Sequence, residues 1–442
     1  MELHFAVAAG LALSCACTTE FNLPLDEDAR PNTEAADAAA NSADAGSGSP
    51  RPGNARSIGS HVGALASLGQ VNAAEGSYVL HLASATFPDN VGRGDKLTLW
   101  PGTAQEKVLY LDSQTSDTEL LLASPAPASV QQAPYQISRA YPSITDWAMA
   151  TVDDLVSAER LEIGVCYNDS PFAENVTLAG AITNEMYYRH LTVADVARHS
   201  GVAGTGALIN PNEPGHGIFV GEDHARVDWL EITDWTRDSP GSFDGINIRA
   251  RDVLIEHVIV HDDGHGAVIN SDAGGIQLES ELGSVTVRNS IVYNLARNGI
   301  AIHSSANAVL NIENSTVYRC VQDDDSAVYG CISVRGANSV ANLRNVIALD
   351  GGGQSDFLLQ VEGAILGVAA NNMSSDASAP GADSIHNERA TIFTSATLGS
   401  EDLHLALGAS ALDSGLDLSA EFSDDIDGQE RSPPWDIGAD ER

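Results

Sequence analysis

Apolar and polar residues alternate in a pattern that recurs five times between Gly217 and Glu362. Each copy opens with Gly-Ile-x-Ile or a close variant and continues, after a gap, into a second apolar segment that ends in a polar or aromatic residue. The opening residues are Gly217, Gly245, Gly275, Gly299 and Cys331. The residues that end the second segment are Trp229, His257, Asn289, Asn314 and Asn345, and their spacing varies from 25 to 32 residues. An internal repeat of this length is typical of a solenoid.

Strict alternation over a few residues predicts strands, and the lack of a long helical pattern predicts that these strands stack coil upon coil. We therefore expect an all-β protein whose main domain is a right-handed parallel β-helix solenoid. The polar column fits this fold in two ways. Its amides can hydrogen-bond from one coil to the next, and Asn tolerates a left-handed turn.

The composition and pattern of the chain predict five regions. They are a signal peptide at 1–17, a disordered tether at 18–56, a small β module at 57–141, the β-helix with a short N-terminal cap helix at 143–400, and a C-terminal β-helix ending at 401–442. The cap helix is expected from Ser143 to Val156, with Ser143 as its N-cap. It would cover the open end of the first coil.

The first region holds an apolar run from Phe5 to Leu13 that is too short to span a bilayer. It predicts a secretory signal of the lipoprotein type, with the lipid on Cys17 or Cys15. An ordinary cleaved signal is the alternative, because no Lys or Arg precedes the run. We expect an exported protein, at the outer membrane or cell surface or else secreted, that meets a membrane only through this anchor.

Acidic residues outnumber basic residues by 61 to 22, which gives a formal net charge of -39. This excess disfavours nucleic acid and anionic membrane surfaces as partners. A solvated acidic surface needs no ligand, and we expect a monomer. Cysteine usage agrees with export: Cys320 and Cys331 flank one loop and are the candidate disulfide, with two buried thiols as the alternative. Cys166 has no evident partner.

Several short elements resemble the pectin-lyase-like right-handed β-helix proteins of bacterial surfaces. They are Glu174-Asn175-Val176-Thr177-Leu178, His190-Leu191-Thr192-Val193, Asp427-Gly428-Gln429-Glu430-Arg431 and Asp436-Ile437-Gly438-Ala439. The resemblance covers residues 143–442 and implies a surface β-helix. It is specific for architecture and says little about activity.

Because coils stack, residues far apart in sequence become neighbours, and a site has to be sought as a column. The outward column expected to bind a substrate contains Arg249, Glu279, His303 and Arg335, followed by Glu362. A second column on another face contains Asp228, Glu256, Arg288, Glu313 and Arg344. Both columns mix positive and negative residues, so ion pairing between coils is the simpler interpretation of each.

The loops before the Gly-Ile strands carry the candidate catalytic residues Asp244, Asp262, Asp263 and His265. The resemblance implies paired carboxylates, or Ca²⁺ with a basic residue, in this groove. Hydrolysis requires one protonated and one ionised carboxyl group, about 6.5–9.5 Å apart for inversion or about 5 Å for retention. Adjacent coils can place carboxylates at such distances.

The same run is similar in part to polygalacturonases. Three of their motifs share letters with Phe243-Asp244-Gly245, Asp262-Asp263 and Gly264-His265-Gly266. The third motif abuts the second here instead of lying one coil later. Their Arg-Ile-Lys element, which the resemblance assigns to the uronate carboxylate, is absent from this sequence.

Two metal sites are also open interpretations. His261, Asp263 and His265 alternate along one loop, so an extended backbone would aim all three side chains one way, as Zn²⁺ or Mn²⁺ requires. An acidic turn with solvated histidines is the alternative. Asp425-Ile426-Asp427-Gly428 offers carboxylates to Ca²⁺ but lacks the bidentate Glu of an EF-hand, so a terminal turn is its alternative.

Three functions remain: a surface-anchored β-helix that binds polysaccharide or extracellular matrix, a polysaccharide hydrolase or lyase, and a structural spacer. The loop-rich acidic side favours the first two over a spacer. The incomplete motifs favour binding over cleavage. Convergence of the Asp244 carboxyl group with that of Asp262 or Asp263 would favour an enzyme.

Overall fold

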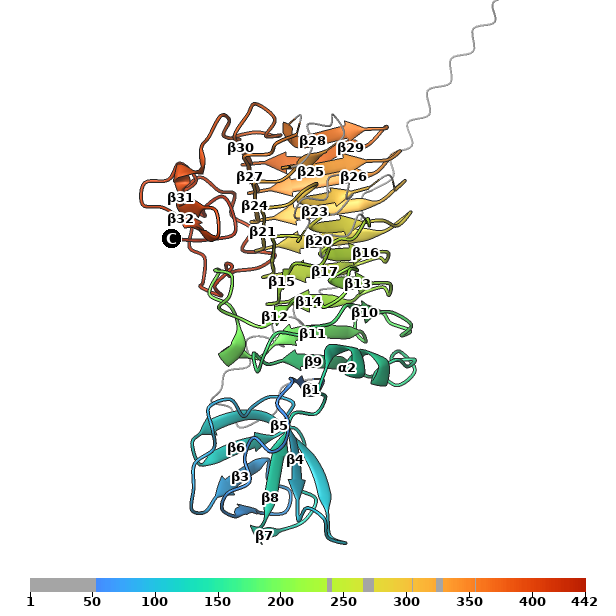
Figure 1. The fold of residues 1–442 in the computed structure, drawn as a ribbon, viewed down its shortest axis with the longest axis vertical. Coiled ribbons are helices and arrows are strands. Elements are labelled where there is room, and N and C mark those ends of the chain that lie inside the picture. The colour runs from blue at the N-terminus through green and yellow to red at the C-terminus, as the bar shows by residue number, and fades with distance from the viewer. Residues whose placement is uncertain (1–52, 237–240, 265–273, 304, 323–328, 354) are drawn as a thin grey trace, which may run out of the picture.

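The computed structural model describes residues 53–236, 241–264, 274–303, 305–322, 329–353 and 355–442. Within these ranges the chain is almost entirely β. Most strands belong to three parallel sheets, which run along a solenoid of stacked coils (Figure 1). The predicted parallel β-solenoid is confirmed. Each complete coil gives one strand to each sheet, so equivalent residues form columns along the solenoid.

The three sheets take their names from one strand each. The β9 sheet contains β1 (Asn54–Ile58), β9 (Glu162–Cys166), β11 (Arg189–Val193), β14 (Arg226–Asp228), β17 (Val253–Glu256), β20 (Ser284–Arg288), β23 (Val309–Glu313), β26 (Val340–Arg344) and β29 (Ile365–Ala370). The β16 sheet contains β10 (Val176–Leu178), β13 (Ile218–Val220), β16 (Ile246–Ile248), β19 (Ile276–Leu278), β22 (Ile300–Ile302), β25 (Gly330–Arg335) and β28 (Ser355–Val361). The β18 sheet contains β12 (Leu208–Ile209), β15 (Glu231–Thr233), β18 (Ile259–His261), β21 (Ile291–Tyr293), β24 (Thr316–Tyr318), β27 (Ile347–Leu349) and β30 (Met373–Ser374).

The repeated Gly-Ile-x-Ile segments form successive strands of the β16 sheet, as predicted. Ile218 pairs with Ile246, and Ile246 pairs with Ile276, so the apolar positions of neighbouring coils are in register. The sequence indicated two strands per coil, but the structure has three, because the chain bends after the second strand and continues into the β18 sheet. Third strands such as Ile291–Tyr293 and Ile347–Leu349 are apolar and buried at every position, so they show no alternation that would reveal them.

The bend between the β9 and β18 sheets lies at the predicted polar column. Trp229, His257, Asn289, Asn314 and Asn345 all have positive φ, between 39° and 60°, which is the left-handed region. The Asn345 side chain also donates to Asn314 Oδ1 at 2.9 Å, and the rings of Trp229 and His257 stack with centroids 4.2 Å apart. The interpretation of the column as a turn is confirmed. The ladder of amide-to-amide bonds is confirmed between Asn345 and Asn314 only, because the amides of Asn289 and Asn314 donate to Asp424 O and Asp436 O of the C-terminal segment.

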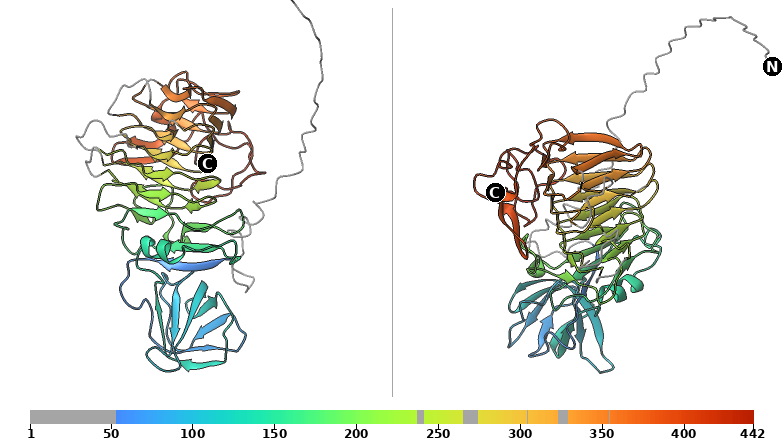
Figure 2. Two further views of the ribbon diagram at one scale, coloured as in Figure 1. Left: turned by 90° about the vertical axis from the view of Figure 1, so that its right-hand side faces the viewer. Right: turned by 45° about the horizontal axis from the view of Figure 1, so that its top comes forward.

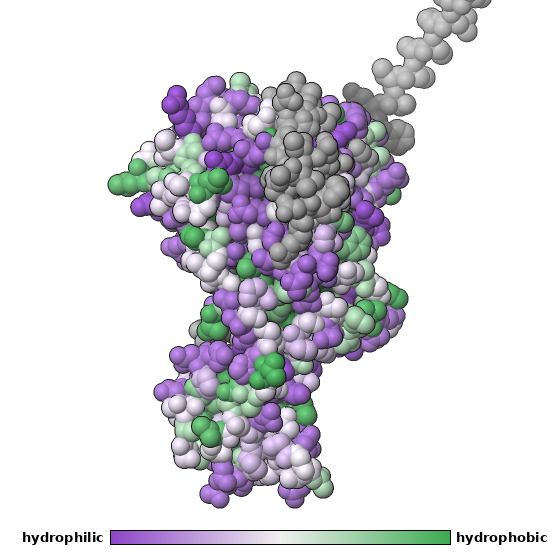
Figure 3. Space-filling model, viewed as in Figure 1, coloured by the Kyte–Doolittle hydropathy of each residue, from purple (hydrophilic) through white to green (hydrophobic). Residues whose placement is uncertain are grey.

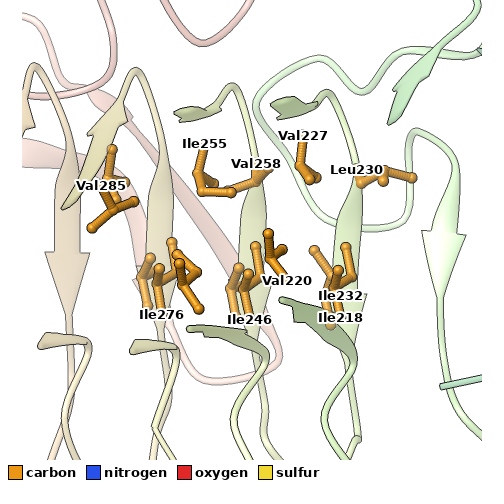
Figure 4. Packing of buried hydrophobic residues seen from close by; sticks show 14 of the residues in the cluster. Ile218, Val220, Val227, Leu230, Ile232, Ile246, Ile255, Val258, Ile276 and Val285 are labelled. Atoms are coloured by element: carbon orange, nitrogen blue, oxygen red, sulfur yellow. The ribbon is translucent and has the colours of Figure 1, made fainter. Parts of the chain in front are cut away.

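Isoleucine and valine side chains from all three sheets fill the solenoid (Figure 4). Ile218, Ile246 and Ile276 point inward from successive coils and are at most 1% exposed. Burying one such side chain stabilises the fold by about 1.5–3 kcal/mol. This core fixes the coils, and therefore holds the outward side chains at a regular spacing.

Helix α2 (Ile144–Ala150) closes the first coil. Ser143 caps it as predicted, because its hydroxyl accepts from Asp146 N at 3.0 Å. The helix is shorter than the predicted one, which extended to Val156. Trp147 is fully buried and packs against Gly164, where a Cβ atom would lie 2.8 Å from the indole ring.

The small module is an antiparallel sheet with its own apolar core. Its strands are β2 (Val71–Ala73), β3 (Val79–Leu82), β4 (Lys96–Leu99), β5 (Lys107–Ser116), β6 (Glu119–Leu122), β7 (Val130–Ala133) and β8 (Tyr135–Ser138). Strand β1 lies before the module in sequence but pairs with β9 of the solenoid. Asn54 to Arg56, inside the region expected to be a tether, therefore belong to a solenoid sheet.

The C-terminal segment differs from the predicted arrangement, in which the β-helix extended to residue 400. The last solenoid strand is β30, and the 3₁₀-helix η2 (Ala390–Ile392) and the hairpin of β31 (Phe393–Thr397) and β32 (Ser400–Leu405) lie beside the solenoid (Figure 2). Apolar residues of this segment pack on outward residues of the β18 sheet, such as Tyr293 and Tyr318. We call residues 375–442 the C-terminal cover.

Cys320 and Cys331 form the predicted disulfide. Cys166 is buried and free. Across the ranges that the structure describes, no helix combines the length and the apolarity needed to span a membrane. The predicted signal peptide and the anchor candidates Cys15 and Cys17 lie outside the described residues.

Candidate functional site

The outward side chains of the β16 sheet form a surface along the solenoid, which we call the polar face. Its first column contains Phe219, Asn247, Gln277, Ala301 and Ser333 from successive coils. Alternate residues of a strand point to opposite sides, so Ile246 and Ile248 enter the core while Asn247 between them points outward. The face is therefore set by the same pattern that builds the core.

Asp244 precedes β16 and is only 2% exposed. Its Oδ1 accepts from Gln277 Nε2 at 2.6 Å and from Gly274 N at 3.0 Å, and its Oδ2 accepts from Asn247 Nδ2 at 2.7 Å. Burial nevertheless raises the pKa of Asp244 to about 7, because the loss of solvation outweighs these three donors. We call Asp244, Asn247 and Gln277 the Asp244 cluster.

Three buried polar atoms of this face have no hydrogen-bond partner among the residues that the structure describes. They are Asn247 Oδ1, Gln277 Oε1 and Ser333 Oγ, and their side chains belong to residues at most 1% exposed. An unpaired buried polar atom costs about 1–3 kcal/mol. Among the described residues, the hydrogen-bonding capacity of these three acceptors is therefore left unused.

Glu279 lies one position beyond β19 and belongs to the predicted substrate column. Its Oε1 is 3.6 Å from His303 Nδ1, and its Oε2 accepts from Arg249 Nη2 at 2.9 Å. The interaction with His303, with smaller contributions from Asn247 and Arg249, lowers the pKa of Glu279 to about 2. Glu279 is therefore ionised throughout the physiological range.

The pKa values of Asp244 and Glu279 are shifted in opposite directions, and the charge of Glu279 is one of the causes that raise the pKa of Asp244. Near neutral pH one carboxyl group still carries a proton while the other is ionised. This division is what general acid and base roles require of two carboxyl groups. Sequence reasoning found both residues but assigned Glu279 to binding.

Aromatic rings lie beside the Asp244 cluster. The ring of His216 is 6.2 Å from that of Phe219 and 5.9 Å from that of Phe243, which meets it edge-on. His216 Nδ1 accepts from Asp244 N at 3.0 Å, and burial lowers the pKa of His216, so the ring is neutral. Sequence reasoning missed His216, although its position one coil before Asp244 was a usable signal.

The two predicted charge columns are confirmed as ladders of ion pairs. On the polar face, Arg335 pairs with Glu362 at 2.9 Å in addition to the Arg249 and Glu279 pair. In the second column, Arg288 pairs with Glu256 at 2.6 Å, and the strand register continues through Glu313 to Arg344. Arg344 contacts Glu313 of the preceding coil and also Glu421 of the C-terminal cover.

The other candidate carboxylates have hydrogen-bond partners that do not belong to the Asp244 cluster. Asp262 bonds to His261 Nδ1 at 2.8 Å and accepts from Asn294 Nδ2 at 3.1 Å. Asp263 is fully buried, and its Oδ2 accepts from Ala296 N at 2.9 Å. Both residues directly follow β18, at the start of the loop that leads to the next strand of the β16 sheet. Their contacts hold the corner of the coil in place.

The arrangement around His261 disfavours the Zn²⁺ or Mn²⁺ site. Both ring nitrogens of His261 are engaged, with Asp262 and with Glu231 Oε1 at 3.0 Å. Burial by itself lowers the pKa of His261, but these two carboxylates outweigh it and raise the pKa to about 9. A protonated imidazole has no lone pair for a metal. His265, the third predicted ligand and a predicted catalytic residue, lies outside the described residues.

Acidic groups near the C-terminus are also explained by their contacts. Asp425, offered to Ca²⁺ by the sequence, accepts from the backbone N–H groups of Asp427, Gln429 and Glu441, as a terminal turn requires. His404, Asp427 and Asp440 place three possible ligand atoms within 4.8 Å of one another. Hydrogen bonds that the His404 ring donates to Asp427 and Asp402 raise the pKa of His404 to about 9, so the histidine itself supplies the positive charge.

No protein-family model and no curated protein matches the sequence. Among solved structures, a pectate lyase (Pel9A) is 13% identical, with a TM-score of 0.35 over 67% of this chain and 90% of its own. The Gp54 tailspike of Acinetobacter baumannii bacteriophage AP22, solved in complex with capsular saccharide, is 8% identical, with a TM-score of 0.20 over 72% of this chain and 57% of its own. At these values the likenesses carry no argument about function, which has to come from the site.

Proposed function

We propose that the protein binds polysaccharide along the polar face of the solenoid. The observation that carries the proposal is the row of accessible side chains above the buried Asp244 cluster, in which exposed Arg249 lies beside half-buried Phe219 and half-buried Glu279. An aromatic ring next to charged hydrogen-bonding groups suits a sugar, which has apolar C–H faces and polar edges.

The solenoid also suits a linear polymer. Its coils repeat at the strand spacing of about 4.8 Å, a distance comparable to the length of one sugar unit. Successive coils therefore offer contacts at a spacing that matches successive units of a chain. A spacer would not need the opposed carboxyl groups of Asp244 and Glu279.

Charge narrows the ligand. A protein of net charge -39 repels polyanions such as polyuronates at low ionic strength, so we infer a neutral polysaccharide. Extracellular matrix glycans of low charge are the related alternative. The expected export of the chain supports an extracellular ligand, as does the disulfide between Cys320 and Cys331, a bond that persists in oxidising compartments.

Affinity electrophoresis of the folded chain in gels that contain neutral, uronate-rich or sulfated polysaccharides tests this proposal. We expect retardation by at least one neutral polysaccharide and a loss of retardation in Phe219→Ala. Phe422→Ala, which removes a ring that packs against Trp435 of the C-terminal cover, is the matched control and should bind normally. Retardation of none, or of the anionic polymers alone, would refute the proposal.

A second candidate function, polysaccharide hydrolysis, is favoured by the opposed pKa values of Asp244 and Glu279. Asp244 would protonate the leaving oxygen, and ionised Glu279 would act as base or nucleophile. Activity then requires protonated Asp244, so it should decline as the pH rises through about 7, the pKa of Asp244. At lower pH the activity should persist until Glu279 becomes protonated, because the pKa of Glu279 is about 2.

A reducing-end assay, run together with detection of unsaturated products, tests catalysis on each polysaccharide that binds. Asp244→Asn and Glu279→Gln should each reduce a hydrolytic rate by about 10²-fold or more. Asp262→Asn is the matched control, because its carboxyl group belongs to the β18 corner. Unsaturated products would indicate a lyase instead. If a polysaccharide binds and no product forms from any of them, hydrolysis is refuted and only the binding function remains.

A further inference from the structure

A cavity of about 360 Å³ lies where the small module meets the first coils, on the side of the β9 sheet and therefore apart from the polar face. The molecule narrows at this junction (Figure 3). The module contributes residues 89–93 and the end of β5, and the solenoid contributes β9, β11 and residues 193–198, which include the 3₁₀-helix η1 (Asp195–Ala197). No function discussed above uses this space.

The walls of the cavity are fixed to one another by buried contacts. Arg139 forms ion pairs with Asp95 of the module at 2.9 Å and with Asp169 of the first coil at 2.8 Å. Its guanidinium group lies 3.5 Å from the centre of the Tyr167 ring. Tyr167, which lines the cavity, donates its hydroxyl to Arg93 O at 3.1 Å. A preformed cavity binds a small ligand without first ordering its walls.

The lining combines an apolar floor with a polar rim. Ile163 and Val165 point outward from β9, and both are only 1% exposed because the module covers them. The rim adds His190 and Thr192 from β11, and Asp228 holds the His190 ring through a contact of 2.7 Å. On the module side, β5 adds hydroxyl groups, as at Ser113.

The charge around the rim is net negative. The lining contains four aspartates, Asp89, Asp112, Asp117 and Asp195, and two arginines, Arg93 and Arg198. Arg198 is paired with Asp195 at 3.1 Å. A ligand with a carboxylate or phosphate would face this excess of aspartates, whereas hydroxyl groups can donate to carboxylates and accept from guanidinium groups.

We propose that the cavity binds a single neutral sugar unit. Its volume lies at the small end of the range for small-molecule sites, about 300–1,000 Å³, so it accommodates one or two sugar rings and not a chain. Exposed Val196 provides an apolar contact for the C–H face of the ring, and the accessible side chains of Asp89, Asp117, Asp195 and Ser113 provide partners for its hydroxyl groups. The module thus acts as half of a sugar-binding site.

Saturation-transfer NMR with the whole folded chain tests this proposal, with glucose, galactose, mannose, N-acetylglucosamine, glucosamine and glucuronate as probes. We expect saturation transfer to at least one of the four neutral sugars and none to glucuronate. Val196, at the rim, is 71% exposed, so Val196→Trp should fold normally and obstruct the cavity. It should weaken binding by about tenfold or more, the effect of losing roughly 1.4 kcal/mol of contacts.

Leu407→Trp adds the same ring at a position that is 89% exposed and remote from the cavity, and it should leave sugar binding unchanged. Phe219→Ala should also leave it unchanged, because that residue belongs to the polar face. Binding of no neutral sugar, binding of glucosamine alone, or equal binding by wild type and a folded Val196→Trp would each overturn the proposal. Equal melting temperatures of the two Trp variants would show that both are folded.

Discussion

The β16 and β18 sheets are built by the same coils, yet their outer faces are completed in opposite ways. On the β18 sheet, His261 is bonded through both nitrogens and stacks on Tyr293 with ring centroids 5.0 Å apart. Asn294 links this network to Glu401 of the C-terminal cover at 2.8 Å. On the β16 sheet, acceptors of Asn247 and Gln277 are left without partners among the described residues, as is Asn294 Oδ1 on the β18 sheet, but no described residue of the C-terminal cover packs over Asn247 or Gln277.

The contrast shows that a buried histidine or aspartate does not by itself indicate chemistry. The network around His261 contains more titratable groups than the Asp244 cluster, but its charges are matched and its surface is covered. At Asp244 the local donors are too few to hold a full charge near neutral pH, and the adjacent side chains remain accessible. The opposed pKa values and the accessible neighbours, rather than burial alone, separate the functional candidate from the structural network.

The largest expected effect on stability comes from weakening the contact between the C-terminal cover and the β18 sheet. Phe393 is 4% exposed and meets the Tyr318 ring at 5.6 Å, so Phe393→Ala should destabilise the fold by about 3–5 kcal/mol. Phe219→Ala on the polar face removes a half-buried ring and should cost less than about 1 kcal/mol. Urea unfolding followed by tryptophan fluorescence compares the two. Equal losses would mean that the two faces do not differ in their contribution to stability.

The second effect has the opposite sign, because Asp244→Asn should stabilise the protein at high pH. The native pKa of Asp244, about 7, lies above its unfolded value near 3.9. The wild type is therefore at full stability below about pH 4, and it loses stability as the pH rises through 7. Asn stays neutral, so the variant should be more stable by roughly 2–4 kcal/mol at pH 8.

The neighbouring amide can accommodate this change. Asn247 Oδ1 has no partner among the described residues, so a rotated Asn247 amide can accept from the new side-chain N–H. The unfolding curves of wild type and Asp244→Asn should coincide at pH 4 and separate at pH 8. A variant that is less stable than wild type at both pH values would show that the ionised carboxylate is a structural group after all.

The third effect concerns His261, whose native pKa of about 9 exceeds its unfolded value near 6.5. The protonated side chain stabilises the fold fully below about pH 6.5, and this contribution is lost as the pH rises through 9. His261→Gln should therefore cost roughly 2–3 kcal/mol at pH 6 and much less above pH 9. The unfolding free energy of both proteins, measured across this range, checks the prediction.

His216 on the polar face is a control of opposite sign. Burial lowers its pKa, so the native protein favours the neutral ring, and the wild type should lose stability as the pH falls below about 6.5. His216→Gln should not share that loss. If both histidine variants responded to pH in the same direction, the assignment of one charged and one neutral ring would be wrong.

Much of this architecture could be predicted from local pattern. The Gly-Ile-x-Ile strands, the left-handed column at Asn289, Asn314 and Asn345, and the charge ladders all follow from a repeat whose equivalent positions must stack. The β18 sheet and the C-terminal cover could not be predicted in the same way. The cover holds the solenoid through single contacts, such as Asn314 Nδ2 to Asp436 O at 3.1 Å, and these leave no period in the sequence.

The candidate site could be predicted only in part. Asp244 and Glu279 stand out as acidic residues beside a strand of the repeat, but their opposite pKa shifts arise from burial and from His303, which no spacing reveals. Asp262 and Asp263 looked equivalent to Asp244 because they occupy the same corner of the next coil. Tertiary contacts with Asn294 and Ala296 make them structural.

The smallest expected effect on stability comes from Arg249→Ala. The Arg249 side chain is 54% exposed, and an exposed ion pair contributes about 0–1 kcal/mol, so the variant should unfold at nearly the same urea concentration as wild type. Arg344→Ala, which separates both Glu313 and Glu421 from their partner, should be more costly. Affinity electrophoresis then distinguishes the two interpretations of the alternating column. Loss of polysaccharide binding in a stable Arg249→Ala protein would assign the arginine to ligand contact, whereas unchanged binding would restrict it to holding Glu279.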